Sequence, residues 1–146
     1  MVRASCLGLL VLVILAGCRI SEREGLTPLP ENAAPLSYAE MMNRARGQAS
    51  SALDAFYIDA WLDLEQAAQR LEQTARFLPK STHIPEAFKT KVEPESEKLR
   101  QDAAKLTEAA RAKNATQVND IMQRINVRIR QLRPVEKAQT EEKQKP

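Results

Sequence analysis

The sequence predicts an all-α protein in which four helices form an antiparallel, up-down-up-down bundle over residues 37–133. Three observations support this fold class. The chain of 146 residues has only 4 Gly and 4% aromatic residues, a composition typical of helical rather than β-rich proteins. Apolar residues recur in alternating steps of three and four within four segments, which places them on one face of each helix. The connections between these segments are short, and short connections favour antiparallel neighbours.

The first helix is expected to begin at Ser37. The stretch Ser37-Tyr-Ala-Glu40 has the spacing of a capping box, in which the two side chains satisfy free amide groups of the first turn. Its predicted core positions are Tyr38, Met42, Ala45, Ala49, Ala52 and Phe56. The same phase would next place Asp59 and Asp63 in the core. The helix is therefore expected to break between Phe56 and Asp59.

The second helix has a shifted phase. Its predicted core positions are Trp61, Leu64, Ala68, Leu71, Ala75 and Leu78. Trp61 is expected to be a core anchor. Asp59 can cap this helix, and Leu78-Pro79 is expected to end it, because a proline disfavours helical backbone at the residue before it. A single long helix with a phase slip is the alternative interpretation of the first two segments.

The third helix follows a loop at residues 79–85. Its apolar positions are Phe88, Val92, Leu99, Ala103, Leu106 and Ala110. Pro94 lies inside this pattern, so the segment before it is expected to be a separate turn or a kinked first stretch. Asn114 and Gln117 offer a second cap of the box type for the fourth helix. That helix carries Val118, Met122, Ile125, Ile129 and Leu132, and Pro134 ends the pattern.

The N-terminus has the features of a secretory signal. Arg3 supplies a positive start, and residues 6–16 are all apolar or small. This run is shorter than the roughly 20 apolar residues that a membrane-spanning helix needs. The stretch Leu15-Ala-Gly-Cys18 resembles the bacterial lipobox, in which the cysteine receives a diacylglycerol and the chain is cut before it. The resemblance implies that residues 1–17 are removed and that acyl chains on Cys18 anchor the protein to a membrane.

The predicted organisation follows from this start. Residues 18–36 form a lipidated N-terminus and a flexible tether, because they contain glycine and proline with no apolar period. Residues 134–146 have too little apolar surface to become ordered, so they are predicted to be disordered. Arg19 stands where many inner-membrane lipoproteins have an aspartate, which favours the outer membrane. The expected location is the bacterial cell envelope, with the domain facing the periplasm.

The side chains available to the mature chain do not favour catalysis. Cys6 leaves with the signal and Cys18 is acylated, so no thiol remains. The sequence has one histidine, His83, and neither a Glu-x-x-His pair nor a nucleophile with a base. We therefore expect no enzyme activity, no metal and no cofactor. The mixed charges, with a net charge of +3, do not resemble a nucleic-acid-binding surface.

A cluster of arginines lies near the end of the fourth helix. These residues are Arg124, Arg128, Arg130 and Arg133. Cations at this position face the negative end of the helix dipole, which accounts for them without a binding role. Contact with anionic lipid or a cell-wall polymer is the second interpretation.

Several motifs together resemble one family. A methionine lies early in the first helix, at Met41 or Met42. The motif W-L-x-L-x-x-A-A-x-x-L begins at Trp61, and L-x-x-A-A-R-A-K-N ends at Asn114. Over residues 37–133 this order resembles the cytochrome c prime-like family of exported four-helix bundles. Members of that family attach haem through C-x-x-C-H late in the last helix, where this chain has N-V-R-I-R at residues 126–130. Covalent haem is therefore excluded.

The resemblance implies a haem-less helical domain with a structural or binding role in the envelope. Its expected partners are the membrane, through Cys18, and a protein partner or a second copy of the chain. One alternative is a noncovalent haem carrier or sensor, in which Met42 and His83 flank the haem at one end of the bundle. Another is a periplasmic helical chaperone or adaptor, which would require an exposed apolar groove.

Overall fold

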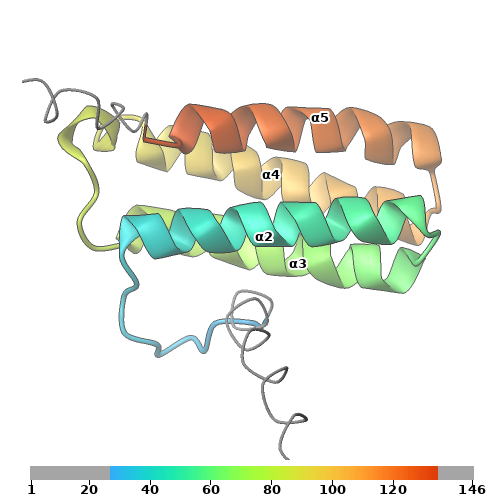
Figure 1. The fold of residues 1–146 in the computed structure, drawn as a ribbon, viewed down its shortest axis with the longest axis horizontal. Helices are drawn as coiled ribbons and strands as arrows, with labels where there is room; N and C mark the ends of the chain where they lie inside the picture. Colours follow the sequence, from blue (N-terminus) through green and yellow to red (C-terminus); the bar gives the residue numbers. More distant parts are fainter. Residues whose placement is uncertain (1–26, 135–146) are drawn as a thin grey trace, which may run out of the picture.

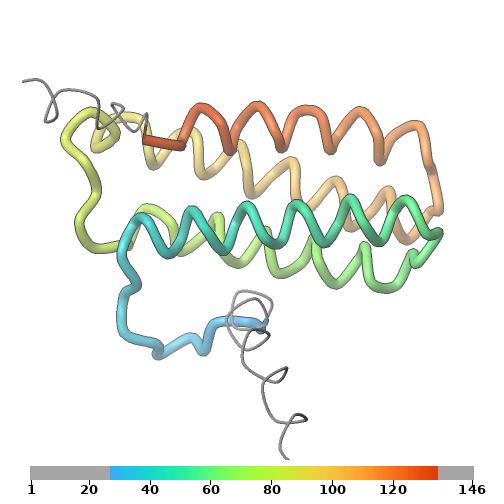
Figure 2. The backbone as a smooth tube through the Cα atoms, in the orientation of Figure 1, coloured from blue at the N-terminus to red at the C-terminus, as the bar shows by residue number. Residues whose placement is uncertain are grey.

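The computed structural model describes residues 27–134, which form the expected four-helix bundle (Figure 1). The helices are α2 (Tyr38–Tyr57), α3 (Trp61–Phe77), α4 (Val92–Arg111) and α5 (Ala115–Leu132). Two short 3-10 turns, η1 (Leu78–Lys80) and η2 (Glu86–Phe88), lie between α3 and α4. Figure 2 shows the backbone reversing direction from each helix to the next along the bundle. The predicted antiparallel, up-down-up-down arrangement is confirmed.

Each helix packs on its neighbours in the chain. Helix α2 contacts α3, α3 contacts α4, and α4 contacts α5, while the contact between α2 and α5 that closes the bundle is the smallest of the four. The core is built largely from alanine, leucine, isoleucine and methionine. The small alanines let neighbouring helices approach closely, and the larger side chains fill the space between them. The seam between α2 and α5 is therefore the least closed side of the bundle.

The predicted core positions of the helices are buried, with exceptions at the bundle ends. All five positions of α5 and all positions of α4 after Phe88 are buried. Phe56 and Trp61 are only partly buried, because they lie where α2 turns into α3. Sequence reasoning missed Met41 and Gln48 of α2, which are also buried. The helix buries a wider stripe than the spacing of its apolar residues indicates.

The break between the first two helices is confirmed, but the expected cap is wrong. The N-cap residue of α3 is Ala60, and no side chain caps this helix. Asp59 instead adopts a left-handed backbone conformation, with φ of 55°. This conformation reverses the chain, so that the amide of Ala60 bonds the carbonyl of Ala55 at 2.9 Å. Asp59 therefore contributes its backbone conformation to the turn, and its side chain does not cap α3.

The other helix starts agree with the sequence. Ser37 and Glu40 form the complete capping box at the start of α2. Asn114 accepts a hydrogen bond from the amide of Gln117 at 3.1 Å, which is one half of the predicted box. Pro94 lies in the first turn of α4, where an amide would have no partner within the helix. The segment before it is the separate turn η2, as one of the two alternatives predicted.

Residues 27–36 form a strap that packs along α2 and α3. The Gln73 side chain of α3 donates to the carbonyl of Leu29 at 2.8 Å and accepts from its amide at 2.9 Å. Arg44 of α2 donates to the carbonyl of Thr27. This part of the predicted tether thus contacts the bundle (Figure 1). The rest of the tether, the signal peptide, Cys18 and the predicted tail after Pro134 lie outside the described residues.

Candidate functional site

One end of the bundle, which we call the closed end, is held together by Tyr38. Its amide donates to the carbonyl of Thr82 at 2.8 Å, and its hydroxyl donates to the carbonyl of Leu132 at 2.5 Å. Its ring centroid lies 6.0 Å from that of Phe88. Burial raises the pKa of the Tyr38 hydroxyl to about 12. Through its backbone amide and its side chain, Tyr38 thus joins the start of α2, the α3–α4 loop and the end of α5.

The two residues considered for noncovalent haem lie near this closed end but in different environments. Met42 is 4% exposed and belongs to the core. His83 is exposed on the α3–α4 loop, has a positive φ of 57°, and places its Nδ1 3.1 Å from the Thr82 hydroxyl. The loop reaches the start of α2, as expected. A haem held by both residues would require Met42 to leave its core packing.

Two residues of the arginine cluster have partners on α4. Arg124 Nε lies 3.1 Å from Oδ1 of Asp102, and Arg128 Nε lies 3.6 Å from Oδ2 of the same carboxylate. Arg128 Nη1 also lies 3.5 Å from Oε2 of Glu95. The Asp102 side chain is 8% exposed, so this carboxylate needs its cationic partners. These two arginines therefore join α5 to α4, which neither sequence interpretation anticipated.

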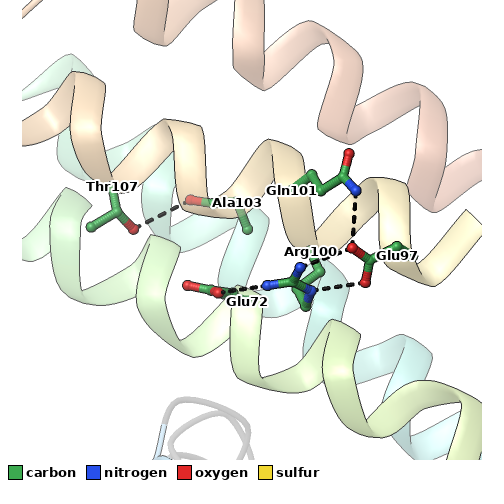
Figure 3. A network of polar contacts seen from close by, with 6 residues as sticks. All are labelled: Glu72, Glu97, Arg100, Gln101, Ala103 and Thr107. Atoms are coloured by element: carbon green, nitrogen blue, oxygen red, sulfur yellow. Dashed lines mark hydrogen bonds and ion pairs between the residues drawn. The ribbon is translucent and has the colours of Figure 1, made fainter.

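A second polar network joins α3 and α4 (Figure 3). Arg100 bonds Glu97 one turn away on α4 and reaches Glu72 of α3 at 3.3 Å. The hydrogen bonds from Arg100 and Gln101 lower the pKa of Glu97 to about 2. Arg100 lines an open groove of about 620 Å³ beside α3. Arg70 and Arg76 line the same groove, where Arg70 bonds the side chain of Gln66 and Arg76 pairs with Glu31.

The opposite end of the bundle exposes apolar side chains at the turn from α2 to α3. Tyr57 and Ile58 are each 75% exposed, and Leu62 is 67% exposed. We call these three residues the tip. Beneath them, the rings of Phe56 and Trp61 pack edge to face with centroids 6.0 Å apart. Neighbouring exposed apolar side chains mark interaction sites on soluble domains.

Sequence reasoning did not single out the tip. The signal was present, because the run F-Y-I-D-A-W-L carries five large apolar residues across the predicted helix break. Only some of them can turn into the core where the chain reverses direction. Phe56 and Trp61 do so in part, and the other three are left facing outward.

A groove of about 830 Å³ runs along the seam between α2 and α5. It lies where the bundle has its smallest interhelical contact. Its apolar lining comes from both helices, and a cation stands on each side. The lining residues are Asn43, Arg46, Gly47, Ala49, Ser50, Leu53, Asn126, Ile129 and Arg130.

Within residues 27–134, no group of three or more His, Cys, Asp or Glu side chains could hold a metal ion. Over the same residues, no helix has the length and apolar character needed to cross a membrane. Comparison with protein-family models, with curated proteins and with solved structures gave no match. The exposed apolar tip and the α2–α5 groove are the candidate functional surfaces of the described residues.

Proposed function

We propose that this chain is a lipid-anchored lipoprotein of the bacterial envelope whose haem-less, cytochrome c prime-like bundle binds a protein partner and has no enzymatic role. The observation that carries the binding role is the exposed tip. Three large apolar side chains facing water at one turn favour association with another surface, because burying them removes apolar area from water. A purely structural bundle would gain nothing from exposing them.

The charges near the described surfaces support binding over catalysis. The buried carboxylate Asp102 is paired with arginines, and Glu97 is paired with Arg100. The Asp102 pairs join α5 to α4, and the Glu97 pair lies within α4. His83, the one imidazole of the chain, lies exposed on a loop beside a hydroxyl. These positions match interhelical and surface roles.

The membrane part of the proposal rests on the sequence around Cys18. An apolar signal followed by Leu-Ala-Gly-Cys favours acylation of the cysteine, and Arg19 favours transport to the outer membrane with the domain in the periplasm. Several acyl chains give stable anchoring, since each buried methylene contributes about 0.8 kcal/mol.

The anchor is tested by expressing the full chain in a bacterium fed a labelled fatty acid. We expect the wild-type chain to carry the label and to stay in the membrane fraction after an alkaline wash. Cys18→Ser removes the acceptor thiol and should lose both properties. Cys6→Ala is the matched control, because Cys6 lies in the signal and should leave labelling unchanged. Labelled Cys18→Ser protein, or an unlabelled wild-type chain, would overturn the anchor.

The binding role is tested by placing a photoreactive amino acid at a single position of the same full chain in cells. At position 62 of the tip we expect covalent adducts with a protein. Position 69, exposed in the middle of α3, is the control and should give few adducts. Equal labelling at the two positions would show that the tip is not a preferred contact surface.

A further inference from the structure

The α2–α5 groove differs from two other grooves of the molecule in the charges that line it. Arg46 of α2 and Arg130 of α5 line it from the two helices, and no acidic residue of the described chain lines it. By contrast, Glu72 lines the groove beside α3, and Glu108 and Asp120 line a smaller groove between α4 and α5. An anion in the α2–α5 groove would therefore meet cations without a competing carboxylate.

The two arginines of this groove have no partner of their own. Within residues 27–134, neither Arg46 nor Arg130 forms a side-chain hydrogen bond or ion pair, whereas Arg124 and Arg128 both pair with Asp102. The negative end of the helix dipole can account for Arg130, which lies in the last turn of α5. It cannot account for Arg46, which lies in the middle of α2. Two exposed cations thus stand beside the groove with their charges available to a ligand.

Neutral polar side chains add hydrogen-bonding capacity beside the two cations. Asn43 and Ser50 of α2 and Asn126 of α5 line the groove, and all three are exposed. Within the part of the chain that the structure describes, none of these side chains forms a hydrogen bond. Amide and hydroxyl groups can both donate and accept hydrogen bonds. This combination suits the hydroxyl groups of a sugar.

Gly47 leaves space for a ligand close to the backbone of α2. It lies in the middle of a 20-residue helix, where glycine weakens the helix relative to alanine. A Cβ atom built at this position would meet nothing within 4 Å, so packing within the described residues does not require glycine. Gly47 lines the groove, whose volume of about 830 Å³ is in the usual range of small-molecule sites.

The two arginines lie at different levels along the bundle. The hydrogen bond from Tyr38 to the carbonyl of Leu132 places the start of α2 beside the end of α5. Arg46 follows Tyr38 by two turns, whereas Arg130 precedes Leu132 by half a turn. This offset corresponds to about 9 Å along two antiparallel helices, at 1.5 Å per residue. A ligand with two separated anionic groups matches this offset better than a single anion does.

We propose that the α2–α5 groove binds a sugar that carries two separated phosphate groups, one paired with Arg46 and the other with Arg130. A guanidinium group binds a phosphate through two parallel hydrogen bonds, which are stronger than neutral ones. The sugar ring lies over Gly47, and its hydroxyl groups bond Ser50 and the two asparagines. Free sugar bisphosphates and the headgroups of phosphorylated glycolipids share this chemistry. The site requires neither the tip nor the lipid anchor, so it stands apart from the proposed function.

Binding is tested by titration calorimetry of the full chain in a non-ionic detergent, with fructose 1,6-bisphosphate as the probe. We expect this bisphosphate to bind about tenfold more tightly than fructose 6-phosphate, because the monophosphate leaves one arginine without a partner. Fructose should show no measurable binding, since it carries no charge. Equal affinities for inorganic phosphate and the bisphosphate would show an adventitious ion only and would overturn the proposal.

The two arginines are tested by removing their charges one at a time. Arg46→Gln and Arg130→Gln should each weaken binding of the bisphosphate about tenfold. The melting temperature should stay nearly unchanged, because both side chains are exposed. Arg133→Gln is the matched control, since it removes the same charge from an exposed arginine outside the groove. An equal loss of affinity in Arg133→Gln would show diffuse attraction and would overturn the site.

Gly47→Leu tests the position of the sugar without disturbing the fold. The new side chain extends into open space, so the melting temperature should rise or stay unchanged. It would occupy the place of the sugar ring, so binding of the bisphosphate should be lost. Gln69→Leu, exposed on α3, adds an apolar side chain away from the groove and should bind as the wild type does. A Gly47→Leu chain with wild-type affinity would overturn the proposal.

Competition in the same detergent distinguishes the two sources of the ligand. Lipid A, a glycolipid whose disaccharide carries two phosphates, is added to the full chain saturated with fructose 1,6-bisphosphate. Displacement of the bisphosphate would support the site with a glycolipid headgroup as its ligand, and retention would support it with a free sugar phosphate. A chain that binds neither probe would overturn the proposal and leave the groove to a protein partner. That result is independent of whether Cys18 is acylated.

Discussion

The two ends of the bundle treat aromatic side chains in opposite ways. At the closed end, Tyr38 is 1% exposed and bonds two distant carbonyls. At the other end, Tyr57 is 75% exposed and stands in the tip with Ile58 and Leu62. The same residue type therefore stabilises the fold at one end and is available for contacts at the other. A residue's type does not reveal its role, and its place in the bundle does.

The two ends differ in how many backbone carbonyls need a hydrogen-bond donor from a side chain. Three segments meet at the closed end, and their free carbonyls need donors, which Tyr38 supplies. At the tip only one short turn joins α2 to α3, and its backbone is satisfied locally by the bond from Ala60 to Ala55. The tip therefore needs no side chain for closure. Its apolar residues are therefore available for contacts with another surface.

The largest expected effect compares the two tyrosines directly. Tyr38→Ala removes a buried ring and leaves a cavity, so we expect the free energy of unfolding to fall by about 4 kcal/mol. Tyr57→Ala removes an exposed ring and should change it by less than about 0.5 kcal/mol. Urea denaturation followed by circular dichroism measures both. Similar losses for the two variants would break the distinction between the ends.

The strap extends the comparison to the side of the bundle. Gln73→Ala removes two hydrogen bonds to Leu29, and we expect a loss of about 2 kcal/mol if the strap unfolds with the bundle. Gln69→Ala, one turn earlier and bonded to Glu65 on its own helix, should lose less than about 0.5 kcal/mol. Hydrogen exchange at the Leu29 amide measures whether the strap leaves the bundle locally. Unchanged protection of this amide in Gln73→Ala would contradict a role of the Gln73–Leu29 hydrogen bonds in holding the strap.

The closed end should also respond to high pH. The pKa of Tyr38 is raised to about 12 in the folded protein, above the ordinary tyrosine value of about 10. Its contribution to stability is therefore complete below about pH 10 and is lost as the pH rises towards 12. Tyr38→Phe should lose about 1 kcal/mol at neutral pH, because Leu132 loses its donor.

The measurement is the difference in unfolding free energy between wild type and Tyr38→Phe at about pH 8 and pH 11. This difference should shrink at the higher pH, since only the wild type has a Tyr38 proton to lose. The lysines titrate in both proteins and do not affect the comparison. A difference that stays constant with pH would contradict the role of the Tyr38 proton.

The helix starts offer a smaller comparison of the two ends. Ser37→Ala at the closed end removes a complete capping box, and we expect a loss of about 1 kcal/mol. Asn114→Ala at the tip end removes a single capping bond and should lose about 0.5 kcal/mol. Thermal melting measures both, and Ser37→Thr should retain most of the cap. A larger loss for Asn114→Ala would reverse the ranking of the ends.

The smallest expected effect on stability is at the tip. The double substitution Ile58→Ser and Leu62→Ser should change the free energy of unfolding by less than about 0.5 kcal/mol, because both side chains are exposed. The same variant should bind less of the fluorescent dye ANS, which reports exposed apolar surface. A marked loss of stability would show that the tip supports the fold and is not a free surface.

Much of the fold could be predicted because its determinants are local. The capping box at Ser37 and the break after Phe56 depend on residues within one or two turns of each other. The core positions of α5 follow from the spacing of apolar residues along one helix. The prediction that Asp59 caps α3 failed because of a local backbone conformation. Asp59 took a left-handed backbone in place of a capping position, which composition and spacing do not reveal.

The sequence by itself determined the four helices, their order and most of their buried faces, because periodicity encodes which side of a helix avoids water. Only the tertiary structure decided which polar groups meet. The bond from Tyr38 to Leu132 spans 94 residues, and the bonds between Leu29 and Gln73 span 44. The pairing of Arg124 with Asp102 and the exposure of the tip likewise depend on helix packing. Such contacts arise from the relative position of helices, which no spacing within a single helix specifies.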